Sequence, residues 1–195
     1  ALPGVTSVST ALVGVLDGNS WGSSVAVEGF EWEPGVDAGS RFNAVGPEYF
    51  STLGMPLIAG REFDESDAFG APEVVIVNEA FTRKFNLDGA QAVGEYMTDD
   101  GSDSNDLDMQ IVGVAQDAAY SDVKDPVPPL FFTAARQNRM LGSRSFYVRT
   151  ALDPSEVMAQ VTPLVNRVDP DLPVDNLKTL EQQVQENVFL DRLIS

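Results

Sequence analysis

The amino-acid sequence predicts an α+β fold with a substantial hydrophobic core. Hydrophobic residues make up 43% of the 195 residues and fall in blocks with strand or helix spacing, which is not the pattern of a disordered chain. The continuous β-branched run 74–77 is typical of a buried strand, whereas Val157, Val161 and Leu164 keep helical spacing. A chain of this length buries roughly two-thirds or more of its unfolded surface, so it forms one large domain or two small ones.

Strands are predicted to dominate the chain up to residue 45. Residues 17–20 are a strong turn signal, and residues 24–28 alternate like a half-buried strand. A short helix is predicted next, with Pro47 at its first helical position and Gly54 at its C-terminal end.

The middle of the chain is predicted to hold a strand, a helix and a hairpin. Asn78 follows the buried strand and is expected to cap a helix that carries Phe81 and Phe85 on one side. Residues 96–97 and 109–115 predict the two strands of the hairpin, with an acidic loop as its tip.

The last third is predicted to be a strand–helix–strand–helix unit. Residues 145–150 form its first strand, and the helix that follows starts at residue 153 and is kinked by Pro163. Residues 172–174 are expected to start a short strand, and Thr179 with Gln182 is expected to open the final helix.

The charge balance argues against nucleic acid and anionic lipid surfaces as partners. Thirty acidic and twelve basic residues give a net charge of −18, which repels nucleic acid and anionic lipid surfaces. Two interpretations remain open: the acidic surface keeps the protein soluble in a salty medium, or it meets a basic partner.

The residue types that usually serve as general base near neutral pH, as thiolate nucleophile and as zinc ligand are missing. The chain has no cysteine and no histidine, so it has no thiolate, no imidazole base and no usual zinc ligand. Residues 18–22 match Gly-x-Ser-x-Gly, but Ser20 has no histidine to activate it, so a hairpin turn is the better interpretation. The sequence also lacks a phosphate-binding Gly-x-x-x-x-Gly-Lys-Ser/Thr motif. We expect no catalytic residues and no cofactor.

One loop concentrates oxygen ligands that suit calcium. Asp99, Asp103, Asn105 and Asp106 are weak calcium candidates, because Ca²⁺ is held by six to eight oxygen atoms. The EF-hand order of ligands is absent, so the alternative is a solvated hairpin tip.

One stretch reverses the local charge. No acidic residue occurs between Asp125 and Asp153, and Arg136, Arg139 and Arg144 lie in this stretch. These arginines either pair with the surplus carboxylates of the chain or dock an acidic partner on an exposed loop. Arg149, by contrast, is predicted to lie on a strand, on the face shared with Tyr147.

An ordered series of short segments carries a family resemblance. Each segment is weak alone, but together they follow the family order over nearly the whole chain: 45–57, 59–63, 75–81, 111–114, 147–150 and 169–174. The chain resembles the MacB-type periplasmic core domain of ABC transporter permeases in the FtsX-like permease family.

The resemblance implies a fold and a role. It implies a porter-like α/β subdomain, residues 1–57 and 140–195, with a smaller inserted α/β subdomain, residues 58–139. It implies a non-catalytic domain on the periplasmic or extracellular side of the cell membrane, which couples cytoplasmic ATP hydrolysis to transport, such as efflux, or to mechanotransmission through conformational change and contact with partners or substrates.

The implied partners are transmembrane segments of its own parent chain, a cytoplasmic ATPase subunit or domain acting indirectly, and a periplasmic adaptor. No run reaches ~18 apolar residues and no leader is expected at Ala1, so we expect a segment of a longer chain, with both ends close together at one membrane surface. The alternative is a secreted ligand-binding protein or a carboxylate-based hydrolase.

Overall fold

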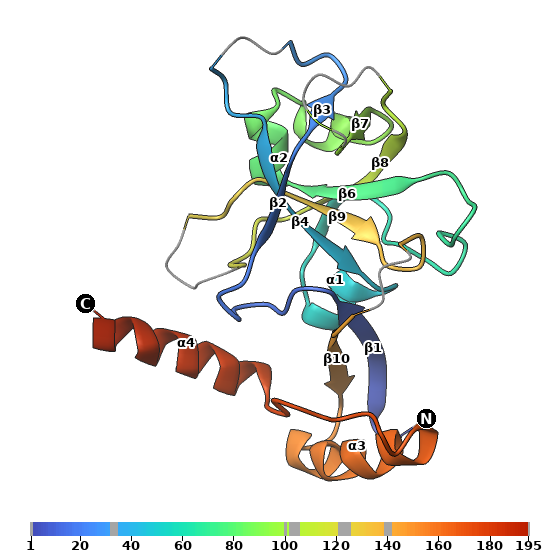
Figure 1. Ribbon diagram of the computed structural model, residues 1–195, viewed down its shortest axis with the longest axis vertical. Coiled ribbons are helices and arrows are strands. Elements are labelled where there is room, and N and C mark those ends of the chain that lie inside the picture. The colour runs from blue at the N-terminus through green and yellow to red at the C-terminus, as the bar shows by residue number, and fades with distance from the viewer. Residues whose placement is uncertain are drawn as a thin grey trace.

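The strands of the protein join in one large mixed sheet. The computed structural model describes residues 2–31, 35–99, 101, 106–120, 126–138 and 142–194, with side chains to residue 189. Ten strands of the described residues form the sheet, in the order β10-β1-β4-β9-β6-β8-β7-β3, with β2 beside β4 and β5 beside β8 (Figure 1). The α+β prediction is confirmed.

The first part of the chain supplies strands from both ends of this order. These are β1 (Val5–Ala11), β2 (Trp21–Ser24), β3 (Ala26–Val27) and β4 (Gly39–Val45). The strand expected over 24–28 is therefore divided between β2 and β3, with Val25 buried between them. Residues 18–22 run into β2 instead of opening a helix, as the turn interpretation of this motif expects.

The short helix α1 (Tyr49–Leu53) begins later than predicted. Pro47 lies before it, and Glu48 turns the chain into the helix with a left-handed φ of 56°. Gly54 ends the helix with a φ of 74°, which confirms its expected role, because glycine adopts this conformation without steric cost.

The middle of the chain forms the strands that cross the centre of the sheet. The elements are β5 (Leu57–Gly60), β6 (Val74–Asn78), α2 (Glu79–Lys84), the short 3₁₀ helix η1 (Gly89–Ala92), β7 (Tyr96–Thr98), β8 (Met109–Ala115) and β9 (Leu130–Ala134). Every residue of β6 is buried, and β7 pairs antiparallel with β8, so the buried strand and the hairpin are confirmed. β9 runs parallel to β4 and antiparallel to β6, which joins the first and middle parts of the chain in one sheet.

The C-terminal part consists of β10 (Ser145–Thr150), α3 (Pro154–Val168) and α4 (Leu180–Ile194). Pro163 lies inside α3, which continues through it as one helix. The strand expected at 172–174 is wrong, because these residues join no strand of the sheet. Pro173 lacks a backbone N–H, which removes one donor from any such pairing. Thr179 and Gln182 do form the expected reciprocal cap of α4, at 3.1 and 2.8 Å.

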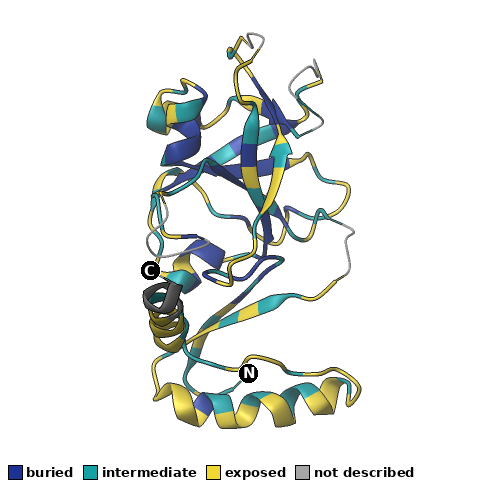
Figure 2. Ribbon diagram, turned by 60° about the vertical axis from the view of Figure 1, so that its left-hand side comes forward, coloured by how far each residue is buried: buried dark blue, intermediate teal, exposed yellow. Residues whose placement is uncertain are grey.

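The core consists of two hydrophobic clusters. The first includes Val45, Tyr49, Phe50 and Phe132, and the second includes Phe81, Phe85 and Phe131. Both clusters contain residues from 1–57 and from 58–139, so the proposed subdomain boundary stays a prediction. Figure 2 shows that buried residues concentrate on the sheet, α1 and α2, whereas α3 and α4 are largely exposed.

The two ends of the chain are less close than expected. Both lie in the half of the molecule that holds α3, α4 and β10, but α4 carries the C-terminus away from the N-terminus (Figure 1). Fifteen helical residues extend about 22 Å at 1.5 Å per residue. Within the described residues, no helix combines the length and the hydropathy that a membrane span needs.

Candidate partner surface

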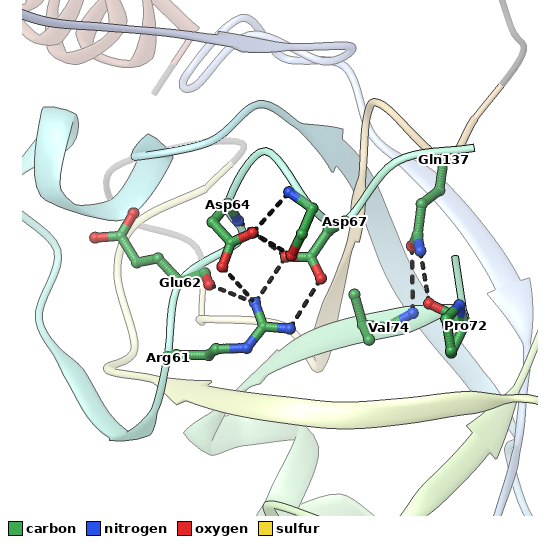
Figure 3. Close-up of polar contacts among 8 residues, drawn as sticks. Arg61, Glu62, Asp64, Asp67, Pro72, Val74 and Gln137 are labelled. Atoms are coloured by element: carbon green, nitrogen blue, oxygen red, sulfur yellow. Dashed lines mark hydrogen bonds and ion pairs between the residues drawn. The ribbon is translucent and has the colours of Figure 1, made fainter. Parts of the chain in front are cut away.

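A tight turn after β5 is organised around a buried carboxylate. Asp67 is only 4% exposed, and its oxygens accept hydrogen bonds from Arg61 Nη1 at 2.7 Å and Arg61 Nη2 at 2.8 Å (Figure 3). The backbone N–H of Asp64 donates to the same carboxylate at 2.9 Å. The hydrogen bonds to Asp67 raise the pKa of Arg61, so the guanidinium stays charged at any physiological pH. Such a bidentate pair holds the turn in one geometry.

Contacts at either side connect this turn to the sheet and to α1. Gly60 has a φ of 75°, and a Cβ atom there would lie 2.1 Å from the Val112 carbonyl oxygen, so only glycine fits. Glu62 accepts a hydrogen bond from the backbone N–H of Ser51 in α1 at 2.9 Å. Asp64 accepts from both the hydroxyl and the backbone N–H of Ser66, which lowers the pKa of the Asp64 carboxyl.

The segment after β9 lies against the loop that contains this turn. Gln137 donates from Nε2 to the Pro72 carbonyl at 2.7 Å and accepts from the Val74 N–H at 3.3 Å (Figure 3). Beside it, Arg136 Nη1 lies 3.5 Å from Glu65 Oε1, and both side chains are exposed. These contacts join loop 61–73 and residues 135–138 into one surface, which we call the Arg136 surface.

The Arg136 surface offers partner contacts of two kinds. The Arg136–Glu65 pair is solvated, so it adds only about 0–1 kcal/mol to stability and leaves the guanidinium accessible. Phe69, on the same loop, is 64% exposed. Aromatic residues and arginine are among the residue types enriched in protein interfaces.

The arginines of the charge-reversed stretch have different surroundings. Arg136 is exposed and belongs to the Arg136 surface, Arg144 is half-buried just before β10, and Arg139 lies outside the described residues. Arg149 lies on β10 as predicted, and its Nε donates to the Thr52 carbonyl of α1 at 2.9 Å. Tyr147 contacts α1 from the same strand, which confirms their shared face. The assignment of the first three arginines to partner docking stays a prediction.

The calcium candidates fall in the sequence between β7 and β8. Asp99 and Asp106 are described, whereas Asp103 and Asn105 lie outside the described residues. The Asp99 carbonyl accepts a hydrogen bond from Ser23 Oγ at 3.0 Å. Within the described part of the chain, no three acidic residues gather closely enough to hold a metal ion. The calcium site stays a prediction.

A second exposed surface lies on the ribbon of β1 and β10. Val8 is paired with Val148 and Thr10 with Phe146, and the two valines and Phe146 are 49%, 41% and 69% exposed. Their face points away from α1, which contacts Tyr147 and Arg149 on the other side. This face of the ribbon is apolar and uncharged, although the chain carries a net charge of −18.

Sequence reasoning missed the pairs that organise the site. Arg61 stands out in the sequence only as part of the family segment 59–63, and no local pattern distinguishes Asp67 or Gln137. An arginine six residues before an aspartate in a polar loop is a weak local signal, and the partner of Gln137 is more than sixty residues away in sequence.

The mixed sheet, its helices and the two core clusters define this chain as an α+β domain. The model of the MacB-like periplasmic core domain matches residues 1–168. The chain therefore belongs to the family of MacB-like periplasmic core domains, which are non-catalytic domains of ABC transporter permeases.

Solved structures agree with this fold. The periplasmic region of MacB from Actinobacillus actinomycetemcomitans is similar with a TM-score of 0.61 and 16% identity, over 94% of this chain and 78% of that chain. A domain of a putative permease protein from Porphyromonas gingivalis is similar with a TM-score of 0.55 and 18% identity, over 94% of this chain and 84% of that one. No curated protein sequence matches the chain.

Proposed function

We propose that this domain couples ATP hydrolysis by a cytoplasmic ATPase subunit or domain to transport or mechanotransmission across the membrane. In this proposal it faces the periplasmic or extracellular side, continues into transmembrane segments of its parent chain, and contacts an adaptor outside the membrane. Family membership supports the location of the domain in a membrane permease, and the continuous sheet supports the transmission of a displacement through the domain.

The continuous sheet is the observation that carries the proposal. β1 pairs with β10 over Val5–Ala11 and meets β4 at its last residue, where Ala11 pairs with Val45. From β4 the ladder of hydrogen bonds continues through β9, β6 and β8 to β7 and β3 at the other end of the molecule (Figure 1). A hydrogen-bonded sheet with a packed core deforms little, because packed interiors have low compressibility. A displacement applied at β1 is therefore transmitted to the distant loops.

Fluorescence in the parent permease, assembled with its ATPase in nanodiscs, tests this proposal. The chain has no cysteine, so Phe69→Cys in the parent permease places one donor dye on the Arg136 surface, once any cysteines elsewhere in the parent are removed. We expect energy transfer to acceptor-labelled lipid headgroups to change when ATP is added, and to stay constant with an ATPase variant that cannot hydrolyse ATP. Constant transfer in the active assembly, through nucleotide-free, ATP and ADP states, would refute the coupling.

We further propose that Arg136, Arg139 and Arg144 dock an acidic surface of the adaptor. Replacing all three with serine is expected to slow association and to weaken its salt dependence, because exposed charges steer encounter and are screened beyond ~8–10 Å. Arg167→Ser, an exposed arginine of α3, is the matched control. A lowered melting temperature with unchanged association would instead show that these arginines pair within the domain.

The division into subdomains is also proposed. Residues 58–139 would form the inserted subdomain and residues 1–57 with 140–195 the porter-like one. Native-state hydrogen exchange tests the boundary, because separate subdomains open as separate cooperative units. A single opening free energy on both sides of residues 57–58 and 139–140 would contradict it.

A further inference from the structure

The loop between β1 and β2 makes one contact after another with different parts of the fold. The backbone N–H of Leu12 donates to the Ala44 carbonyl of β4 at 2.9 Å. The N–H of Val13 donates to Asn43 Oδ1 at 3.0 Å, and Asn43 Nδ2 donates back to the Val13 carbonyl at 2.8 Å. Asn43 is completely buried, so this reciprocal pair satisfies an amide that would otherwise be costly to bury.

Residues 15 and 16 of the loop reach the edge strand and the segment after β8. The N–H of Val15 donates to the Tyr147 hydroxyl of β10 at 2.7 Å. The N–H of Leu16 donates to the Tyr120 carbonyl at 2.8 Å. Four residues of one loop, 12, 13, 15 and 16, are thus hydrogen-bonded to β4, to β10 and to the chain that follows β8, while the N–H of Gly14 donates to Asp17 within the loop at 3.1 Å.

The same loop is hydrogen-bonded to α4. Gln183 Nε2 donates to the Leu16 carbonyl at 2.7 Å, across 167 residues of sequence. Leu16 is 6% exposed and has a φ of 58°, a conformation that disfavours side chains with a Cβ atom. A buried leucine persists in such a conformation where its surroundings determine it, and here its N–H and its carbonyl are both engaged.

We infer that loop 12–17 is a mechanical latch that couples the position of α4 to the sheet through the Gln183–Leu16 hydrogen bond. When α4 is displaced, Leu16 loses one of the two bonds that hold its left-handed backbone. The loop then relaxes, and with it the bonds of Val13 to Asn43 on β4 and of Val15 to Tyr147 on β10.

This inference deepens the proposed function and rests on it only for the origin of the displacement. The latch itself is a property of the 195-residue chain and is tested without membrane or ATPase. Its failure leaves the proposed coupling standing, and unchanged lipid-headgroup transfer in the assembly leaves the latch standing.

Amide hydrogen exchange in the 195-residue chain measures the latch directly. Gln183→Met removes the donor and keeps the length of the side chain. We expect exchange at Val15 and Leu16 to rise about fivefold, the effect of one ordinary hydrogen bond, with no change at Ile76 in β6. Gln183→Lys, which restores a donor, is expected to recover much of the protection.

The matched control is Gln185→Met, on the same helix and exposed, whose side chain donates to Glu181 within α4 at 3.5 Å. We expect this variant to leave exchange in loop 12–17 unchanged. Unchanged exchange at Leu16 in Gln183→Met would overturn the latch. An equal rise at Ile76, or an equal rise in the control, would also overturn it, because it would show a general loss of stability.

A double-mutant cycle supplies a second, independent readout. Gln183 and Tyr147 bond to adjacent residues of the loop, so the latch requires their effects on the free energy of unfolding to be coupled. We expect Gln183→Met combined with Tyr147→Phe to be non-additive, and Gln185→Met combined with Tyr147→Phe to be additive. Additivity in both pairs would overturn the proposal.

Discussion

Asn78 makes three hydrogen bonds from a buried position, and its replacement by alanine tests how much these bonds contribute to the stability of the fold. Asn78 is 3% exposed. Its Oδ1 accepts from the N–H of Phe81, as a helix cap, and from the N–H of Leu130 in β9, both at 2.9 Å. Its Nδ2 donates to the Pro128 carbonyl at 2.9 Å. One side chain therefore joins β6, α2 and β9.

The size of the effect follows from these bonds. Loss of the cap costs about 1 kcal/mol. Leu130 and Pro128 each lose a partner for a backbone group, at about 1 kcal/mol or more each. We expect Asn78→Ala to lower the free energy of unfolding by about 3 kcal/mol, which lowers the melting temperature by about 6–12 °C in a domain of this size.

Urea denaturation followed by circular dichroism measures this change. Asn78→Asp keeps the acceptor and replaces the donor, so we expect an intermediate loss of stability, while Asn166→Ala, on the exposed side of α3, is expected to change stability by less than about 0.5 kcal/mol. A loss below about 1 kcal/mol for Asn78→Ala would refute the reasoning, because it would mean that the contacts with Leu130 and Pro128 contribute nothing.

Three further predictions concern the turn and the buried tyrosines. Asp67→Asn is expected to destabilise the domain by about 2 kcal/mol in urea denaturation, less than a fully buried ion pair because Arg61 is partly solvated; unchanged stability would contradict the role of the pair. Tyr147→Phe removes the acceptor for a backbone N–H of loop 12–17, so we expect the free energy of unfolding to fall by about 1 kcal/mol. Tyr120→Phe is expected to cost less, because within the described residues the buried Tyr120 hydroxyl has no partner in hydrogen-bond geometry. Nearby Asn43 only partly offsets the rise that burial causes in the pKa of Tyr120. Burial raises the pKa of Tyr49, Tyr120 and Tyr147 above the unfolded value near 10. Their contribution to stability is therefore complete below about pH 10 and is lost as the pH rises further, by up to about 1.4 kcal/mol per pH unit for each tyrosine. A urea midpoint that stays constant from pH 8 to pH 11 would exclude this.

Local signals in the sequence were sufficient for the features that depend on nearby residues. The cap of α2 by Asn78, the glycine that ends α1 and the Thr179–Gln182 cap of α4 were all predicted, because each forms within about one helical turn. The buried strand at 74–77 was predicted for a related reason, since a continuous β-branched run suits only a position with both faces covered.

Features that depend on distant partners were not predictable in this way. Residues 172–174 have the composition of a strand but join none, because a strand exists only where another edge accepts it. The start of α1 was misplaced because Glu48 adopts a left-handed conformation that few residues signal.

The sequence by itself determined the α+β class of this protein and its relation to a family of permease domains, because composition, periodicity and ordered short segments are properties of the chain itself. The tertiary structure alone decided that Asn78 also holds β9, that Arg61 closes on Asp67, and that loop 12–17 joins β4, β10 and α4. Each of these depends on side-chain and backbone groups meeting in space, and no local propensity specifies which donor reaches which acceptor.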